Sequence, residues 1–181
     1  MKSLIMAMAL FISVSANAQI TKVTIQASGL TCSMCSNSIN KSLQSLDIVD
    51  KVYSNIQSSS FDVTFKPNSV ISFDALKKKV EDAGFSVAKL TAAIRFDQLE
   101  VGTDQHIKVD GMVMHFLNAK DQTINGVKTV QVVDRGYVSA KQFKKNELYT
   151  SMPCYKTGVA GSCCSKSGSA DAGQRIYHVT I

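Results

Sequence analysis

The 181-residue sequence has no tryptophan, only two prolines and few aromatic residues (7%). Its second half contains no glycine-rich phosphate loop, no clustered carboxylates and no cysteine with a base beside it in the sequence. Nucleotide-dependent and nucleophilic enzymes depend on such features. We therefore expect a binding protein and not an enzyme.

Long apolar runs are also missing. The longest, from Leu4 to Val14, has about 11 residues, whereas a helix needs roughly 20 to span a bilayer. Lys2 precedes this run, and Ala16 and Ala18 follow it at the spacing of an A-x-A cleavage site. The sequence thus predicts a signal peptide at residues 1–18 and a periplasmic or secreted protein with no stable membrane anchor.

The sequence carries only a mild excess of positive charge, +6, from 20 basic and 14 acidic residues. Removal of Lys2 with the leader leaves 19 basic residues and a net charge of +5. The lysines are scattered, and no basic run is interleaved with aromatic residues. We expect no nucleic-acid partner.

Residues 19–92 show alternating strand-like and helical periodicity. Cys35, Ile39, Leu43 and Leu46 recur at helical spacing, with Thr31 as a plausible N-cap, and a second helix follows Ser72. The expected strands cover residues 20–27, 48–56, 61–66 and 85–90. This βαββαβ order predicts a ferredoxin-like domain.

Residues 93–181 instead contain four runs that are rich in β-branched and aromatic residues. The expected strands cover residues 106–116, 127–133, 137–141 and 175–181, and Asn125-Gly126 is a predicted turn. Residues 91–104 form either a linker or a lead-in strand. We predict an α+β protein whose second domain, of unknown role, is a small antiparallel β-barrel or sandwich with a mobile Gly/Ser-rich loop at residues 157–173.

The five cysteines fall into two groups. Cys32 and Cys35 form a C-x-x-C pair, whereas Cys154, Cys163 and Cys164 lie near the end. Because neighbouring cysteines rarely bridge each other, a disulfide from Cys154 to Cys163 or Cys164 is the expected pairing. The remaining thiol could then serve an accessory soft-metal site.

The C-x-x-C pair is suited to a soft ion. Copper(I) and mercury(II) favour thiolates at low coordination number, whereas zinc favours four ligands. No histidine or carboxylate lies within the surrounding GLTCSMC sequence. We predict that Cys32 and Cys35 bind copper(I), with mercury(II) as the second choice, and that Cys35, in the first helical turn, ionises more easily than a free cysteine.

The GLTCSMC sequence, at a strand-to-helix junction, resembles the Gly-Met-Thr-Cys-x-x-Cys pattern of the heavy-metal-associated domain family. The resemblance covers residues 20–90, including Ala83-Gly84-Phe85, with Leu30 in place of the usual methionine. It implies a copper chaperone or scavenger that exchanges its ion with a metal-transport protein or another metal-binding domain. A periplasmic mercury(II) scavenger with the same site is the alternative within this family.

Two other interpretations of the C-x-x-C pair remain. A thiol-disulfide oxidoreductase or redox sensor also uses this motif, although the intervening residues here are Ser33-Met34 and not Gly-Pro. A disulfide that only tightens the turn is the other.

Methionine and histidine residues in the second half offer further copper ligands. Met112, Met114 and Phe116 should share one face of a strand, opposite Val113 and His115, and core packing is the favoured role for the methionines. We interpret His106 and His178 as simple surface or hydrogen-bonded residues.

Overall fold

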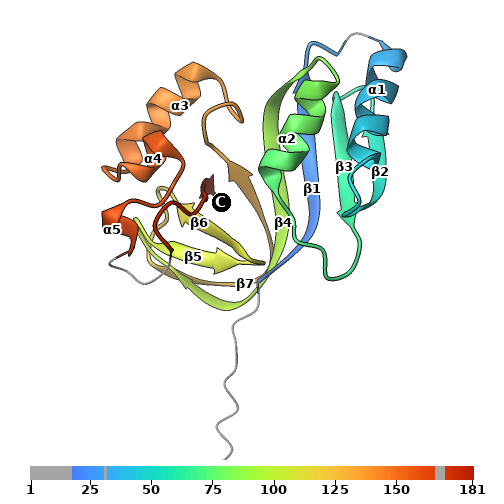
Figure 1. Cartoon of the computed structure of the whole chain (residues 1–181). Helices are drawn as coiled ribbons and strands as arrows, with labels where there is room; N and C mark the ends of the chain where they lie inside the picture. Colours follow the sequence, from blue (N-terminus) through green and yellow to red (C-terminus); the bar gives the residue numbers. More distant parts are fainter. Residues whose placement is uncertain (1–17, 31, 166–169) are drawn as a thin grey trace, which may run out of the picture.

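The computed structural model describes residues 18–30, 32–165 and 170–181, and its strands form one eight-stranded mixed sheet (Figure 1). The strand order is β2-β3-β1-β4-β7-β8-β6-β5. The first four strands in this order belong to the first half of the sequence, and the other four belong to the second half.

The first half has the predicted βαββαβ arrangement. Its elements are β1 (Gln19–Ser28), α1 (Ser33–Gln44), β2 (Val49–Asn55), β3 (Ser60–Phe65), α2 (Phe73–Asp82) and β4 (Ser86–Val101). Both helices lie on the same face of the sheet (Figure 1). Ser72 caps α2 as expected, because its side chain accepts a hydrogen bond from the backbone N–H of Ala75.

The core of this half follows the sequence periodicity. Alternate residues of β1 are buried, and they meet the apolar stripes of α1 and α2 in one cluster. The main contributors are Val23, Ile25, Ile39, Leu43, Leu76 and Val80. The ferredoxin-like prediction is confirmed for this part of the chain.

Strand β4 is longer than predicted and continues into the second half. Residues 91–101, interpreted above as a linker or a lead-in strand, extend β4 and pair with β7. β4 therefore crosses the predicted domain boundary at 92–93. One hydrophobic cluster also contains both Ile39 of α1 and Tyr177 of the last strand. The division into two domains at residues 92–93 stays a prediction.

The second half is rich in strands, as predicted, but it shares the sheet of the first half. Its strands are β5 (His106–Val109), β6 (Met112–Phe116), β7 (Gln122–Val132) and β8 (Ile176–Thr180). β6 and β8 pair in parallel, so the arrangement is not wholly antiparallel. A closed barrel or a sandwich is not confirmed.

The predicted strand at residues 137–141 is wrong. Tyr137 and Val138 lie in a loop, and α3 (Ala140–Asn146) begins directly after Ser139. The Ser139 hydroxyl accepts a hydrogen bond from the N–H of Gln142, so this residue is an N-cap. The β-branched and aromatic residues of the loop concealed this helix start.

Asn125-Gly126 is not a turn, because both residues lie within β7. Gly126 has φ +74 and stands opposite a register shift in β4 between Phe96 and Leu99, so it belongs to a β-bulge. The hairpin turn is instead Asp110-Gly111, where both residues have positive φ and Val109 pairs with Met112.

The segment predicted to be a mobile loop has ordered elements among its described residues. After η1 (Glu147–Tyr149) come the short helices α4 (Cys154–Thr157) and α5 (Ser162–Ser165). Ala160, Cys164 and Ala170 are buried together in a second hydrophobic cluster. The described parts of residues 157–173 are therefore packed against the sheet, and not free of it.

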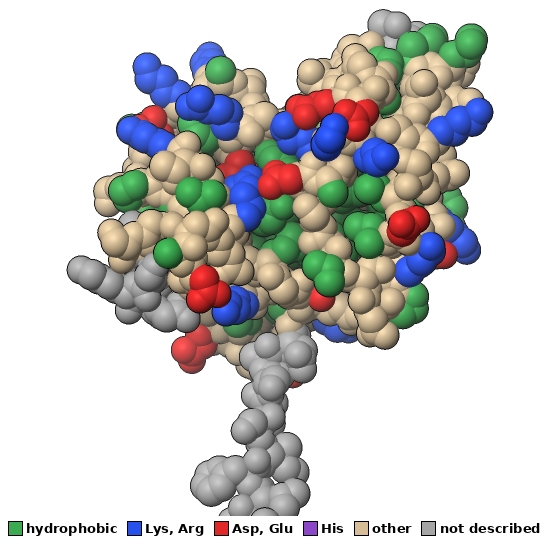
Figure 2. Space-filling view, viewed as in Figure 1, with side chains coloured by type: hydrophobic (Ala, Val, Ile, Leu, Met, Phe, Trp, Pro, Cys, Tyr) green, Lys and Arg blue, Asp and Glu red, His purple; other side chains and the backbone are tan. Residues whose placement is uncertain are grey.

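The predicted signal peptide lies outside the described residues except for Ala18. Within the described part of the chain, no helix combines the length and apolar character needed to cross a membrane. In the space-filling view a notch separates the surface over α3 from the surface over α2 (Figure 2).

A polar network connects α2 to the second half. Asp74 at the start of α2 receives hydrogen bonds from the Tyr137 hydroxyl (2.6 Å) and from Arg175 Nε (2.8 Å). Burial alone would raise the pKa of Asp74, but these hydrogen bonds and the Arg175 charge hold it below its ordinary value. Arg175 also contacts Asp134 at 3.0 Å.

We predict that Asp74→Ala lowers the free energy of unfolding by about 1 kcal/mol at neutral pH, a modest loss because the side chain is 46% exposed. The contribution of a carboxylate with a depressed pKa is present above its ordinary pKa of about 3.9 and is lost as pH falls through the folded value. Denaturant unfolding of wild type and variant should therefore converge at low pH.

The matched control is Asp82→Ala, because Asp82 is on the same helix and forms a surface ion pair with Lys78. It should change stability by less than about 0.5 kcal/mol. An Asp74 variant as stable as this control at pH 7 would contradict the network's role.

Candidate metal centre

The C-x-x-C pair lies where β1 gives way to α1. Cys32 is the N-cap of α1, with extended backbone angles (φ −147, ψ 158), and its Sγ accepts a hydrogen bond from the N–H of Cys35 at 3.3 Å. The prediction of Thr31 as N-cap is therefore wrong, and Thr31 itself lies outside the described residues. The sulfur of Cys32 replaces the oxygen that normally caps a helix.

This geometry makes Cys32 the more acidic of the two thiols. Hydrogen bonds from the thiol and the backbone N–H of Cys35 lower the pKa of Cys32. Donating to Cys32 raises the pKa of Cys35, and partial burial adds to that rise. The prediction that Cys35 ionises more easily than a free cysteine is wrong, because the N–H of the first turn is directed at the sulfur of the capping residue Cys32.

The pair is open to solvent on one side. Cys32 is exposed, Cys35 is half-buried, and Met34 between them is 82% exposed. Below the loop, Leu30 and Phe85 pack against the main core. Among the described residues, no histidine, carboxylate or further cysteine forms a three-ligand group with this pair.

The later cysteines lie elsewhere. Cys154 in α4 and Cys164 in α5 are buried in the second hydrophobic cluster, away from solvent. Cys163 belongs to α5, but its side chain lies outside the described part of the structure. The predicted disulfide involving Cys154 stays a prediction.

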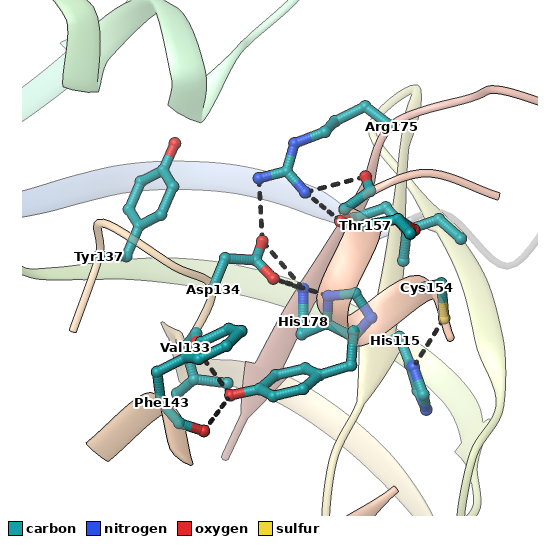
Figure 3. Close-up of polar contacts among 12 residues, drawn as sticks. His115, Val133, Asp134, Tyr137, Phe143, Cys154, Thr157, Arg175 and His178 are labelled. Carbon is teal, nitrogen blue, oxygen red and sulfur yellow. Dashed lines mark hydrogen bonds and ion pairs between the residues drawn. The ribbon is translucent and has the colours of Figure 1, made fainter. Parts of the chain in front are cut away.

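Cys154 lies beside His115 and beside His106, which was interpreted above as a simple surface or hydrogen-bonded residue. Its Sγ is 3.6 Å from Nε2 of His106 and 3.8 Å from Nδ1 of His115. Figure 3 shows Cys154 and His115 pointing toward each other. All three side chains are buried, and their potential ligand atoms lie within 4.8 Å of one another.

The environment keeps both imidazoles neutral at neutral pH. Burial, together with the nearby His178 and His106, lowers the pKa of His115 to about 4. Burial and His178 also lower the pKa of His106. On its other side, Nε2 of His115 lies 3.0 Å from the Asp104 carboxylate.

A third buried histidine adjoins this group without joining it. Nδ1 of His178 lies 2.6 Å from Asp134, whose carboxylate also pairs with Arg175 (Figure 3). Nε2 of His178 finds no hydrogen-bond partner among the described residues. No histidine is visible on the face shown in Figure 2, in keeping with this burial.

The predicted division of β6 into two faces is confirmed. Met112, Met114 and Phe116 pack into the main core, and Val113 packs into the second cluster, where Cys154 also lies. The methionines are therefore core residues. The alternation of side chains along the predicted strand correctly placed His115 on the face opposite the methionines. No pattern in the sequence predicted that His106 and Cys154 would lie beside His115.

The sequence model of the heavy-metal-associated domain family matches residues 24–86. The copper chaperone CopZ of Bacillus subtilis is 33% identical over 66 residues, which cover 36% of this chain and 94% of that protein. The copper-transporting ATPase RAN1 of Arabidopsis thaliana is 34% identical over 85 residues, 45% of this chain and 8% of the ATPase.

A solved structure of the yeast copper transporter domain Ccc2a, in apo and Cu(I)-loaded states, is 31% identical, with a TM-score of 0.34. It aligns with 37% of this chain and 90% of that domain. The chain spans about a tenth of the length of the copper ATPases that it matches. Through the domain at residues 24–86, the chain belongs to the heavy-metal-associated domain family.

Proposed function

We propose that this protein is an exported copper(I)-binding protein, a chaperone or scavenger, that holds its ion between Cys32 and Cys35. The observation that carries the proposal is the exposed thiol pair at the start of α1, in which a backbone N–H is directed at one sulfur. An anionic sulfur is favoured there by the hydrogen bond and by the positive end of the helix dipole.

The choice of ion follows from ligand number. Two thiolates suffice for copper(I) or mercury(II), whereas zinc favours four ligands. The described residues add no third histidine, cysteine or carboxylate to the pair. Copper comes before mercury because the relatives named above are a copper chaperone and copper transporters.

The open side of the pair supports exchange with another protein. Cys32 is accessible, and the 82% exposed Met34 beside it offers an apolar contact surface. An incoming thiolate from a metal-transport protein or another metal-binding domain could reach the ion before both original bonds break. We propose binding and transfer, with no chemical turnover, as the role of this site.

The test is a competitive titration of the reduced protein with copper(I), mercury(II) and zinc(II), scored by affinity and by ions bound per chain. We predict that Cys32→Ser with Cys35→Ser removes one tightly bound copper(I) relative to wild type and leaves the circular dichroism spectrum unchanged. Ser33→Ala, a change within the same loop, should retain that ion.

Full copper stoichiometry in the double variant would contradict the proposal. A much higher affinity for mercury(II) than for copper(I) in the presence of competing thiols would assign the site to mercury. Rapid turnover of a disulfide substrate by metal-free protein would instead support an oxidoreductase.

We also predict that Cys32 is alkylated at lower pH than Cys35. Peptide mass mapping after brief iodoacetamide treatment between pH 6 and 10 would follow each thiol. The pH at which alkylation of Cys32 reaches half its maximal rate should lie below the pKa of a free thiol, about 8.5. In Cys35→Ala the value for Cys32 should rise, because one of the groups that stabilise its thiolate is gone. Equal profiles for the two cysteines in the wild type would contradict the capping geometry.

A further inference from the structure

Three histidines form a row across the second half of the sheet. His106 on β5 is the register partner of His115 on β6, and His115 is the partner of His178 on β8. Register partners project from the same face of a sheet. The ring centroids accordingly lie 4.7 Å and 5.0 Å apart along the row. Cys154, at the start of α4, meets this row at His106 and His115.

The sulfur-to-nitrogen distances match those of ligands that share a metal ion. Metal–sulfur and metal–nitrogen bonds of about 2.3 and 2.0 Å, with angles near 110–120° at the metal, place sulfur and nitrogen about 3.5–3.7 Å apart. The observed separations from Cys154 are 3.6 Å to His106 and 3.8 Å to His115. The two ring nitrogens also lie within 4.8 Å of each other, so all three atoms surround one point that an ion could occupy.

A hydrogen-bonded core explains the same contacts less well. A thiol has a single proton, yet the sulfur of Cys154 faces a ring nitrogen on each of two histidines. Sulfur is also a weak acceptor, so an N–H directed at it gains little. A metal would satisfy all three groups at once.

Asp104 supplies the outer support that metal-binding histidines commonly have. Its carboxylate lies 3.0 Å from Nε2 of His115 and accepts a hydrogen bond from the N–H there. Nδ1 of the neutral ring then carries the lone pair, and this nitrogen faces Cys154. The ring is therefore held in the tautomer that a metal ion requires. His106 also lines a surface pocket, together with Asp104 and Met152.

We propose that His106, His115 and Cys154 form a second metal site, buried in the second half of the protein, that binds copper. Two imidazoles and one thiolate are the ligands of trigonal copper sites in proteins, whereas zinc favours a fourth ligand. Among the described residues the group has no fourth histidine, cysteine or carboxylate within the same range. The thioether of Met152, at the pocket, is also a soft group.

This site is separate from the C-x-x-C pair. Figure 1 shows α4, β5 and β6 on the opposite side of the molecule from α1, whose first turn carries Cys35. The proposal does not depend on copper binding at Cys32 and Cys35. Variants lacking those two thiols can therefore test it alone, and failure of one site leaves the other unaffected.

The experiment uses the reduced Cys32→Ser, Cys35→Ser protein titrated with copper(I) against a chromophoric chelator. We expect one bound ion per chain, and X-ray absorption should show one sulfur and two nitrogen ligands. Adding Cys154→Ser should abolish this binding. Cys164→Ser is the matched control, a buried cysteine of the same hydrophobic cluster that is outside the three-ligand group, and it should retain the ion.

A second pair of variants keeps the test decisive if Cys154→Ser fails to fold. His106→Gln should abolish binding, and Asp104→Asn should weaken it by about 10- to 100-fold, as loss of outer support to a metal-binding histidine does. Each variant is compared with its parent by circular dichroism. No bound copper in the parent, unchanged binding after Cys154→Ser or His106→Gln in a folded protein, or sulfur-only coordination would overturn the proposal.

Discussion

Strand β4 is the element on which the rest of the structure depends, because it is hydrogen-bonded along both edges. β1 pairs with its residues 86–95 and β7 with its residues 90–101, so the central part carries a partner on each side. Leu90, Ala92, Ile94 and Phe96 alternate along it as fully or almost fully buried residues. In a ferredoxin-like domain the last strand normally lies at an edge of the sheet. Here that strand, β4, is followed in the sheet by β7, β8, β6 and β5.

Because both halves share β4, the two candidate metal sites lie on one continuous sheet. The first site lies on the loop after β1, and the second lies beyond β7 and β8, so β4 and the shared core connect them. Polar contacts reinforce the connection, since Arg175 pairs with Asp74 of α2 and with Asp134, which in turn contacts His178. Direct polar contacts therefore connect β8 and the residue before it with α2.

The first half could be predicted from the sequence because its signals are local. The i, i+3, i+4 spacing of Ile39 and Leu43 gives a helix, and Ser72 gives a cap, without knowledge of distant partners. The C-x-x-C pair needs only three residues of separation. A lowered thiol pKa was predicted for Cys35 but is found at Cys32, because capping geometry depends on backbone angles that spacing does not reveal.

The second half could not be predicted in the same detail, because its arrangement depends on contacts between residues far apart in the sequence. Strand β8 inserts between β7 and β6 and pairs in parallel with β6, with register partners 63 residues apart in the sequence. His106, His115 and Cys154 are brought together only by that insertion and by the short helix α4. Composition gave the β-rich character, but it could not give strand order. Helix α3 was likewise not predicted, because it has only seven residues and the segment before it is rich in β-branched residues.

The two thiol environments differ in a way that bears on how each would handle an ion. An ion at the exposed Cys32 would keep one open side, and an incoming ligand could add before an old bond breaks, which favours fast exchange. An ion held by Cys154 would lie among side chains no more than 4% exposed, so release would require local opening and the exposure of buried apolar surface. Burial thus favours retention at the second position. Ligands of the same soft class would then serve opposite kinetic roles within one sheet, with the difference set by solvent access and not by the sulfur itself.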